Sequence, residues 1–204
     1  MKTTPTPPEY NRGTRERLIG AMLDALQCRG FHGVGLNEVL TQAGAPKGVL
    51  YHHFPGGKTE LAVAAIENAV ARIQASFTQL YAREGDALRV LQAWLGYAQK
   101  QLEQSGFERG CPFATVALES TAEDSALRAA LTQGFAAIRT QLAAMLAESG
   151  MRPPRAAQLA LLIVAAYEGG LMQARVAGHL APLKEVCDTL LTLVADEQTT
   201  GTPT

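Results

Sequence analysis

The side chains best suited to polar recognition gather in one short segment of the chain. Lysine, tyrosine and histidine side chains that donate hydrogen bonds occur there at Lys47, Tyr51, His52, His53 and Lys58. Donors spaced this closely suit the phosphate oxygens and base edges of nucleic acid. The four histidines and three cysteines show no metal-ligand spacing, and the sequence holds no nucleotide-binding glycine pattern or nucleophile motif. The sequence therefore indicates binding rather than catalysis, and we expect no catalytic residue, no metal and no cofactor.

Two short helices around a tight turn are predicted to carry these donors, over residues 35–54. Leu36, Val39 and Leu40 fall at helical spacing, Gly44 ends the first helix, and Pro46 opens the second. The outward face of the second helix would then present Lys47, Gly48, Val49, Tyr51, His52 and His53. This pattern is typical of a DNA-binding helix-turn-helix, although an ordinary helical hairpin would share its apolar spacing.

The segment from Thr14 to Leu61 resembles the N-terminal domain of TetR-family transcriptional regulators. The resemblance rests on the Ala43-Gly44 turn, the run from Lys47 to Phe54, and Lys58. Two further pieces, residues 54–58 and 110–119, resemble the LmrA-like branch of that family. The resemblance implies a dimer that reads a palindromic double-stranded DNA operator and senses a small molecule in its C-terminal domain. DNA would be contacted by Lys47, Gly48, Val49, Tyr51, His52, His53 and Lys58, with one histidine equally suited to a structural role.

Helical periodicity continues through the rest of the chain, so an all-α fold is predicted. We expect a flexible arm over residues 1–13, a three-helix DNA-binding domain over 14–60, a helical effector-binding and dimerisation domain over 61–197, and a loose tail over 198–204. Thr59 is expected to cap a long helix that joins the two domains. The first 60 residues carry 7 Lys+Arg and 5 Asp+Glu, whereas the remainder carries 11 and 14, so a weakly basic head precedes an acidic body.

The longest apolar run, Leu159–Tyr167, is well short of the roughly 20 residues that span a bilayer. Three widely separated cysteines give no disulfide framework. We therefore expect a soluble cytoplasmic protein with no membrane partner.

The second domain is more apolar than a DNA-binding head requires, and the resemblance implies an effector pocket inside it. Aromatic walls with few polar groups suit a flat, largely apolar effector. Candidate lining residues are Trp94, Tyr97, Cys111, Phe113, Val116, Glu119, Tyr167, Glu168 and Met172. Glu168 stands seven residues before Arg175, so an ion pair is the leading interpretation and ligand recognition the second. Cys111 lies beside a helix start, which leaves sensing of oxidants or electrophiles as an alternative.

The last two helices, over residues 155–178 and 182–196, are expected to form an isologous four-helix dimer interface. Its candidate residues are Leu162, Gly169, Gly170, Leu183, Val186, Leu190 and Val194.

A ligand-responsive repressor is the leading function. An activator remains open, because the position of the operator decides whether binding represses or activates transcription. The rivals are a nucleoid protein without a ligand and, least favoured, a helical enzyme acting on a small molecule.

Overall fold

The computed structural model describes residues 10–200, and within that range every regular element is an α-helix. The predicted all-α fold is therefore confirmed. The helices are α1 (Tyr10–Arg29), α2 (Leu36–Ala43), α3 (Lys47–His53), α4 (Gly57–Glu84), α5 (Ala87–Gln104), α6 (Pro112–Glu119), α7 (Ser125–Glu148), α8 (Pro153–Ala177) and α9 (Ala181–Thr200).

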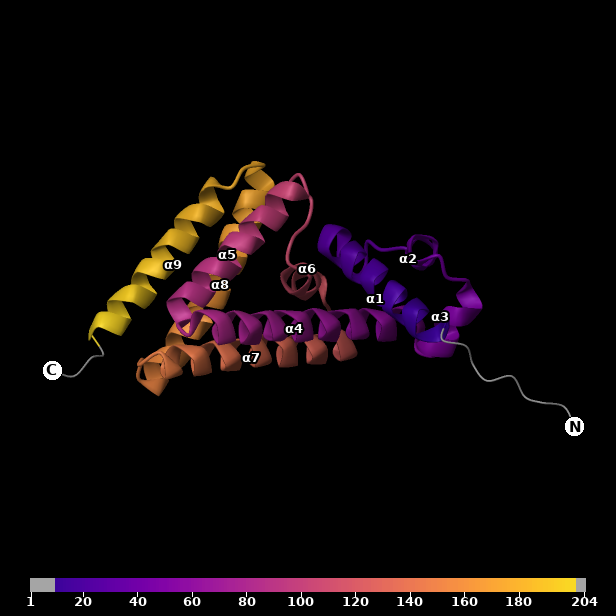
Figure 1. The fold of residues 1–204 in the computed structure, drawn as a ribbon. Coiled ribbons are helices and arrows are strands. Elements are labelled where there is room, and N and C mark those ends of the chain that lie inside the picture. Colours follow the sequence, from indigo (N-terminus) through magenta and orange to yellow (C-terminus); the bar gives the residue numbers. More distant parts are fainter. Residues whose placement is uncertain (1–9, 201–204) are drawn as a thin grey trace, which may run out of the picture.

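The molecule is elongated, with a head of α1, α2 and α3 at one end and the α8–α9 pair toward the other (Figure 1). The long helix α4 leaves the head and runs beside α7 through the body. The short helix α6 lies between the body and α1, which it contacts. Both α4 and α6 therefore join the head to the body.

The turn between α2 and α3 follows from its glycine and proline. Gly44 adopts a left-handed φ of 58°, and its N–H donates to carbonyls of the last turn of α2. Pro46 has an extended backbone and directly precedes the first residue of α3. Leu50 and Phe54 are buried and hold α3 against α1 and α2. Arg17 of α1 donates to the Ala43 carbonyl at 3.0 Å, which satisfies an end group of α2.

The predicted domain limits differ from the helix limits. Residues 10–13 of the expected arm belong to α1, and residues 198–200 of the expected tail belong to α9. Residues 1–9 and 201–204 lie outside the described part of the chain. Thr59 lies inside α4 rather than capping it, because the helix begins at Gly57 and the Glu60 carboxylate accepts the Gly56 N–H at 2.6 Å.

Within the described residues, α8 alone is long and apolar enough to cross a membrane by length and composition. It packs between α7 and α9, and 33% of its most apolar window is buried. Leu159, Ile163 and Leu171 face the core, whereas Leu161, Met172 and Val176 are exposed. One side of α8 thus packs in the core, and Leu161, Met172 and Val176 form an apolar stripe on its exposed side.

The packing of α4 against α7 gives a stability prediction, because a Cβ on Gly134 would lie 2.8 Å from the Val70 Cγ2 atom. A Cβ on Gly96, in α5, would meet nothing within 4 Å. Gly96→Ala should raise the free energy of unfolding by about 0.5–1 kcal/mol through helix propensity. Gly134→Ala should instead lower it by about 1 kcal/mol or more through overpacking. Urea unfolding followed by circular dichroism measures both, and equal stabilisation would contradict the close approach.

Candidate functional site

The exposed face of α3 carries the candidate DNA contacts. Lys47, Gly48, Tyr51 and His52 are exposed, and Val49 is partly buried. Lys47 and Gly48 open the helix, which is the end that meets base edges when a recognition helix enters a major groove. The Tyr51 side chain is 44% exposed. Its Cε1 atom would lie 3.4 Å from a Cβ on Gly57, so the start of α4 positions the ring.

The two histidines of α3 have different surroundings. The Nε2 atom of His53 is buried without a hydrogen-bond partner, and the ring lies beside His52 and Phe54. Burial, followed by the nearby charges of His52 and Arg15, lowers the pKa of His53 below 6.5. The lowered pKa favours the neutral form of His53, and its buried Nε2 atom faces the interior of the head, whereas His52 is exposed. Of the two histidines, His53 therefore fits the structural role better.

Lys58 does not share the exposed face of α3. Its Nζ atom lies 4.4 Å from the centroid of the Phe31 ring, a cation–π contact. Burial lowers the pKa of Lys58, and the carboxylate of Glu119 opposes that shift. To contact DNA as expected, Lys58 would have to leave the Phe31 ring, where it lies between head and body.

A partly open cavity of about 520 Å³, here called the first cavity, lies among α4, α5, α7 and α8 of the body and reaches α1 of the head. Six of the expected effector residues line it: Trp94, Tyr97, Cys111, Phe113, Tyr167 and Glu168. The rings of Trp94 and Tyr167 are 5.0 Å apart, and Phe77 lies 5.3 Å from Trp94 on the other side. The volume falls within the range of pockets that enclose small organic ligands.

The remaining expected effector residues lie elsewhere. Val116 is fully buried in the core and lines neither of the two main cavities. Glu119 and Met172 line a second, more open cavity between α6 and α8. Val116 and Glu119 thus lie away from the first cavity, because α6 turns Val116 toward the core and Glu119 toward the head.

Part of the cavity wall was not anticipated from the sequence. Helix α1 contributes Leu23, Asp24 and Gln27, so the head itself closes one side. Arg72 and Phe77 of α4 also line it. Phe77 was identifiable as an apolar position of α4, but nothing in the pattern of α1 shows that its polar residues face a cavity. That placement depends on how the head docks on the body.

Glu168 is placed where the two cavities meet, and the expected ion pair with Arg175 is not formed. The Arg175 guanidinium instead donates to the carbonyls of Cys28 and Glu108, each at 3.2 Å. The Oε2 atom of Glu168 is buried without a hydrogen-bond partner, while the Cys111 thiol donates to the carboxylate. Burial raises the pKa of Glu168 to about 7.

Cys111 and Tyr167 are held in their neutral forms around this carboxylate. Burial raises the pKa of the Cys111 thiol well above its ordinary value, and Glu168 raises it further. Burial also raises the pKa of the Tyr167 hydroxyl, with Cys111 and Glu168 contributing. A protonated thiol is a poor nucleophile, so this setting disfavours covalent chemistry at Cys111.

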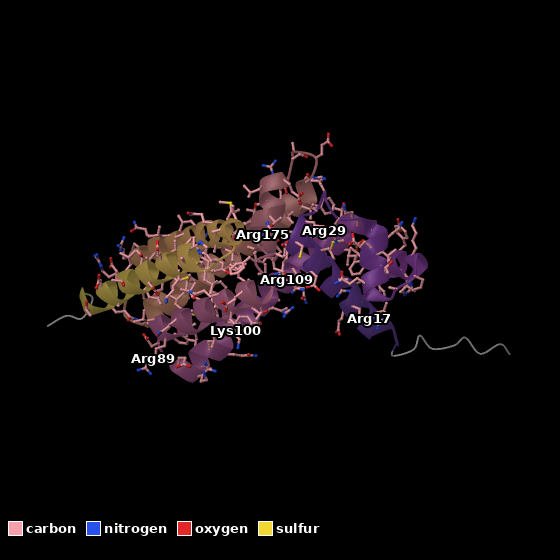
Figure 2. The ribbon with its side chains drawn as sticks, turned by 90° about the horizontal axis from the view of Figure 1, so that it is seen from above. Arg17, Arg29, Arg89, Lys100, Arg109 and Arg175 are labelled. Atoms are coloured by element: carbon pink, nitrogen blue, oxygen red, sulfur yellow. The ribbon has the colours of Figure 1, made fainter. Side chains whose placement is uncertain are left out.

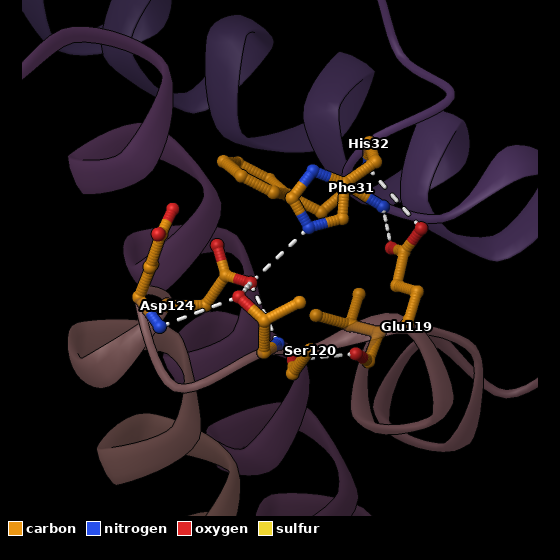
Figure 3. A network of polar contacts seen from close by, with 8 residues as sticks. Phe31, His32, Glu119, Ser120 and Asp124 are labelled. Atoms are coloured by element: carbon orange, nitrogen blue, oxygen red, sulfur yellow. Dashed lines mark hydrogen bonds and ion pairs between the residues drawn. The ribbon is translucent and has the colours of Figure 1, made fainter.

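Glu119 links α6 to the loop that follows α1. Its carboxylate accepts the backbone N–H of Phe31 and, at 3.2 Å, that of His32 (Figure 3). A Cβ on Gly30 would lie 2.5 Å from the same carboxylate, so this approach requires glycine, which also takes a φ of 71°. His32 pairs with Asp124 at 3.1 Å in the same network. Glu119 thus connects the head to the body and does not line the first cavity.

Other groups of the body bind the last turn of α1. The Gly110 N–H donates to the Gln27 carbonyl at 3.0 Å, beside the bond from Arg175 to Cys28. Arg109 pairs with Asp24 at 3.3 Å. Figure 2 shows Arg109 and Arg175 at the junction of head and body. We call these contacts and the Glu119 bonds the α1 junction, formed by Asp24, Gln27, Cys28, Phe31 and His32 with Arg109, Gly110, Glu119 and Arg175.

The expected dimer residues divide between the surface and the interior. Leu183, Leu190 and Val194 of α9 are buried, and Val186 is packed against the core. A Cβ on Gly170 would lie 3.2 Å from Val186, so Gly170 serves the contact of α8 with α9 inside one subunit. These five residues therefore pack within one subunit, and their expected contact with a second subunit stays a prediction. Leu162 is exposed and Gly169 is partly exposed.

Comparisons with known proteins match both parts of the chain. Residues 18–65 match the model of the tetR family of bacterial regulatory proteins, and residues 87–189 match that of the LmrA/YxaF-like C-terminal domain of transcriptional regulators.

Relatives match nearly the whole length. An HTH-type transcriptional regulator of Mycobacterium tuberculosis is 33% identical over 191 residues, covering 91% of this chain and 96% of that one. The HTH-type transcriptional regulator LmrA of Bacillus subtilis is 28% identical over 173 residues, covering 85% and 92%. The crystal structure of reduced NemR from Escherichia coli superposes with a TM-score of 0.74 at 28% identity, covering 87% and 94%.

The Glu119 bonds give a prediction for the α1 junction. Glu119→Ala leaves the N–H groups of Phe31 and His32 without their acceptor, so the free energy of unfolding should fall by about 1–3 kcal/mol. Backbone amide exchange at residues 31 and 32 should accelerate. Glu123→Ala, on the exposed loop after α6, is the matched control and should change neither quantity. Unchanged exchange in Glu119→Ala would show that these bonds do not hold the loop.

Proposed function

This chain belongs to the TetR family of DNA-binding transcriptional regulators, in the branch with an LmrA/YxaF-like C-terminal domain, and we propose that it is a dimeric repressor released from a palindromic operator by a small, largely apolar effector. Membership makes it a helix-turn-helix regulator rather than an enzyme. The repressor sense, the operator symmetry and the effector class are the proposal. Because it acts on DNA, we place it in the cytoplasm.

One observation carries the proposed response to a ligand: α1 of the head forms one side of the first cavity. Leu23, Asp24 and Gln27 face the same space as Trp94 and Tyr167 of the body. A ligand in the cavity therefore contacts the head and the body at once. No long relay through the protein is needed to connect effector and DNA.

Release follows if the effector favours a head position that fits the operator poorly. A ligand shifts a conformational equilibrium only by its difference in affinity for the two states. A ligand between α1 and the body makes such a difference, because the α1 junction fixes their separation. A shift of α1 would carry α2 and α3 with it, since α1 packs directly on both.

DNA reading is assigned to the exposed face of α3. Lys47, at the helix start, donates to a guanine edge or a phosphate, and Gly48 lets the backbone approach the groove. Val49 offers a methyl contact to thymine. Tyr51 and His52 donate to phosphates, which fix the register of the helix without reading sequence.

The dimer contact is assigned to the outer stripe of α8. Residues 161, 165, 169, 172 and 176 follow one another at helical spacing along it. Leu161 is 54% exposed, Met172 55% and Val176 85%, which is unusual for large apolar side chains of a soluble regulator. A second copy would cover this stripe about a two-fold axis.

Sensing through Cys111 is the weaker alternative. The raised pKa of its thiol keeps the sulfur protonated at neutral pH, and thiolate is the reactive form. A noncovalent effector agrees better with the neutral, partly buried thiol.

Selection of bound fragments from a random DNA library, at about physiological salt, tests the repressor proposal. We expect a palindromic site. Lys47→Ala should weaken binding to it and reduce the slope of log affinity against log salt by roughly 0.9 per lysine removed if Lys47 contacts phosphate. Tyr51→Phe should weaken it about fivefold by loss of a hydrogen bond. Weak binding without a motif would overturn the proposal.

The dimer assignment predicts that Val176→Glu and Leu161→Glu convert the protein to monomers at micromolar concentration, because each places a charge in an apolar contact. Sedimentation velocity measures the mass. Lys100→Glu, an exposed charge change on α5, is the control and should leave the dimer intact. Dimers of unchanged stability in both α8 variants would exclude the outer stripe as the interface.

A further inference from the structure

One oxygen of the Glu168 carboxylate has no hydrogen-bond partner at the wall of the first cavity. It interrupts the apolar helix α8 and lines both cavities. Its Oε2 atom is buried without a hydrogen-bond partner, and the cation expected for it, Arg175, is engaged at the α1 junction. The Cys111 thiol is a weak donor and carries no charge. Within the described residues, the negative charge is therefore not matched by a paired cation.

A buried carboxylate without a countercharge is costly, and proteins retain such groups mostly where they do work. Burial raises the pKa of Glu168 to about 7, so the carboxyl is close to half ionised at neutral pH. A ligand that brings a positive charge to Oε2 would supply both the missing hydrogen bond and the missing countercharge. A neutral donor would supply only the first.

The walls around Glu168 also favour a cation with an apolar body. Trp94 and Tyr167 pack with ring centroids 5.0 Å apart, and Phe77 extends the aromatic surface. Aromatic faces attract cations when the surroundings exclude water. Aliphatic side chains, including Leu91, Ile138 and Ile163, complete the apolar part of the wall, while Asp24, Arg72 and Arg109 form its polar part.

We propose that the cavity binds an apolar organic amine, with its ammonium group on the Glu168 carboxylate and its hydrocarbon or aromatic body against Trp94, Tyr167 and Phe77. This inference deepens the proposed function, because it names the chemical class of the effector. It assigns Glu168 as the specificity-determining residue of the site. The N–H groups of the ammonium donate to the Glu168 carboxylate once the buried Oε2 atom turns toward the cavity. The negative charge of Glu168 is then paired with a positive charge.

The pH dependence of binding follows from the groups that line the two cavities. They are Asp24, Arg72, Tyr97, Arg109, Cys111, Glu119, Arg139, Tyr167, Glu168 and Arg175, with Cys187 beside Tyr167. Arginine stays charged throughout the working range. Cys111, Tyr167 and Cys187 have raised pKa values and remain neutral. Burial raises the pKa of Glu168 to about 7, so its ionisation changes between pH 6 and pH 8.

Three compounds that share one ring system separate the effects of charge from those of shape. They are 4-phenylbenzylamine, which is cationic, 4-phenylbenzyl alcohol, which is neutral, and 4-phenylbenzoate, which is anionic. Binding to the full-length protein is measured by titration calorimetry and by fluorescence of Trp94, the single tryptophan of the chain. At pH 8 we expect the amine to bind at least about tenfold more tightly than the alcohol, and the carboxylate most weakly.

The amine's advantage over the alcohol should fall roughly tenfold between pH 8 and pH 6, as Glu168 becomes protonated. Glu168→Gln should remove the advantage at pH 8 while leaving alcohol binding within about threefold of the wild type. Glu103→Gln, on the exposed side of α5, is the matched control and should retain the full preference. The wild-type comparison across pH stands on its own if Glu168→Gln does not fold.

Equal binding of amine and alcohol by the wild type, preference for the carboxylate, absence of binding by all three, or an unchanged preference in Glu168→Gln would each overturn the inference. Operator binding is measured separately, so the two proposals fail in distinguishable ways. Selection of a palindrome without an amine preference would overturn only the proposed effector class. Binding of the amine without specific DNA binding would support the proposed ligand site and overturn the repressor function.

Discussion

The last turn of α1 ends in backbone groups that need hydrogen-bond partners, and the body of the protein supplies several of them. Gly110 and Arg175 bind carbonyls of Gln27 and Cys28, and Glu119 binds the N–H groups of the following loop. A helix end left unsatisfied inside a protein is costly, so these contacts hold the head in one position on the body. Helix packing in the head then transmits that position to the DNA-reading helix α3. The α1 junction is therefore the constraint on which the orientation of the reading helix depends.

The first cavity lies directly beside this junction, and the two share residues or immediate neighbours. Asp24 and Gln27 line the cavity and belong to the junction, and Cys111 of the cavity follows Gly110 of the junction. Arg175 could have neutralised Glu168 but binds α1 instead, which leaves a negative charge in the cavity while a positive charge holds the head. The same distribution of charges thus stabilises the junction and leaves the cavity open to a cationic ligand. The proposed ligand recognition and the position of the head therefore depend on the same arrangement of charges.

Local sequence rules predicted the helices and most of the side chains exposed on α3. Gly44 stands at the end of α2 in the left-handed conformation that favours glycine, and the aromatic residues expected in a pocket do line one. The rules failed where a partner is distant in sequence. Glu119 binds a loop 88 residues earlier, and Arg175 binds a carbonyl 147 residues away, so neither role is visible in local spacing. The inward turn of His53 and the interior position of Leu190 likewise depend on how helices pack, which apolar periodicity alone does not determine.

We propose that the α1 junction couples the cavity to the reading helix. This coupling is tested most directly by the operator dissociation constant with and without saturating 4-phenylbenzylamine, in the wild type and in Glu119→Ala. The account predicts that the amine weakens operator binding by wild type about 5- to 150-fold, the usual range of allosteric coupling. In Glu119→Ala, which loosens the junction but leaves Glu168 in place, that ratio should move toward one. An undiminished ratio in the variant would contradict the account, because the effector would then act on the head without the junction.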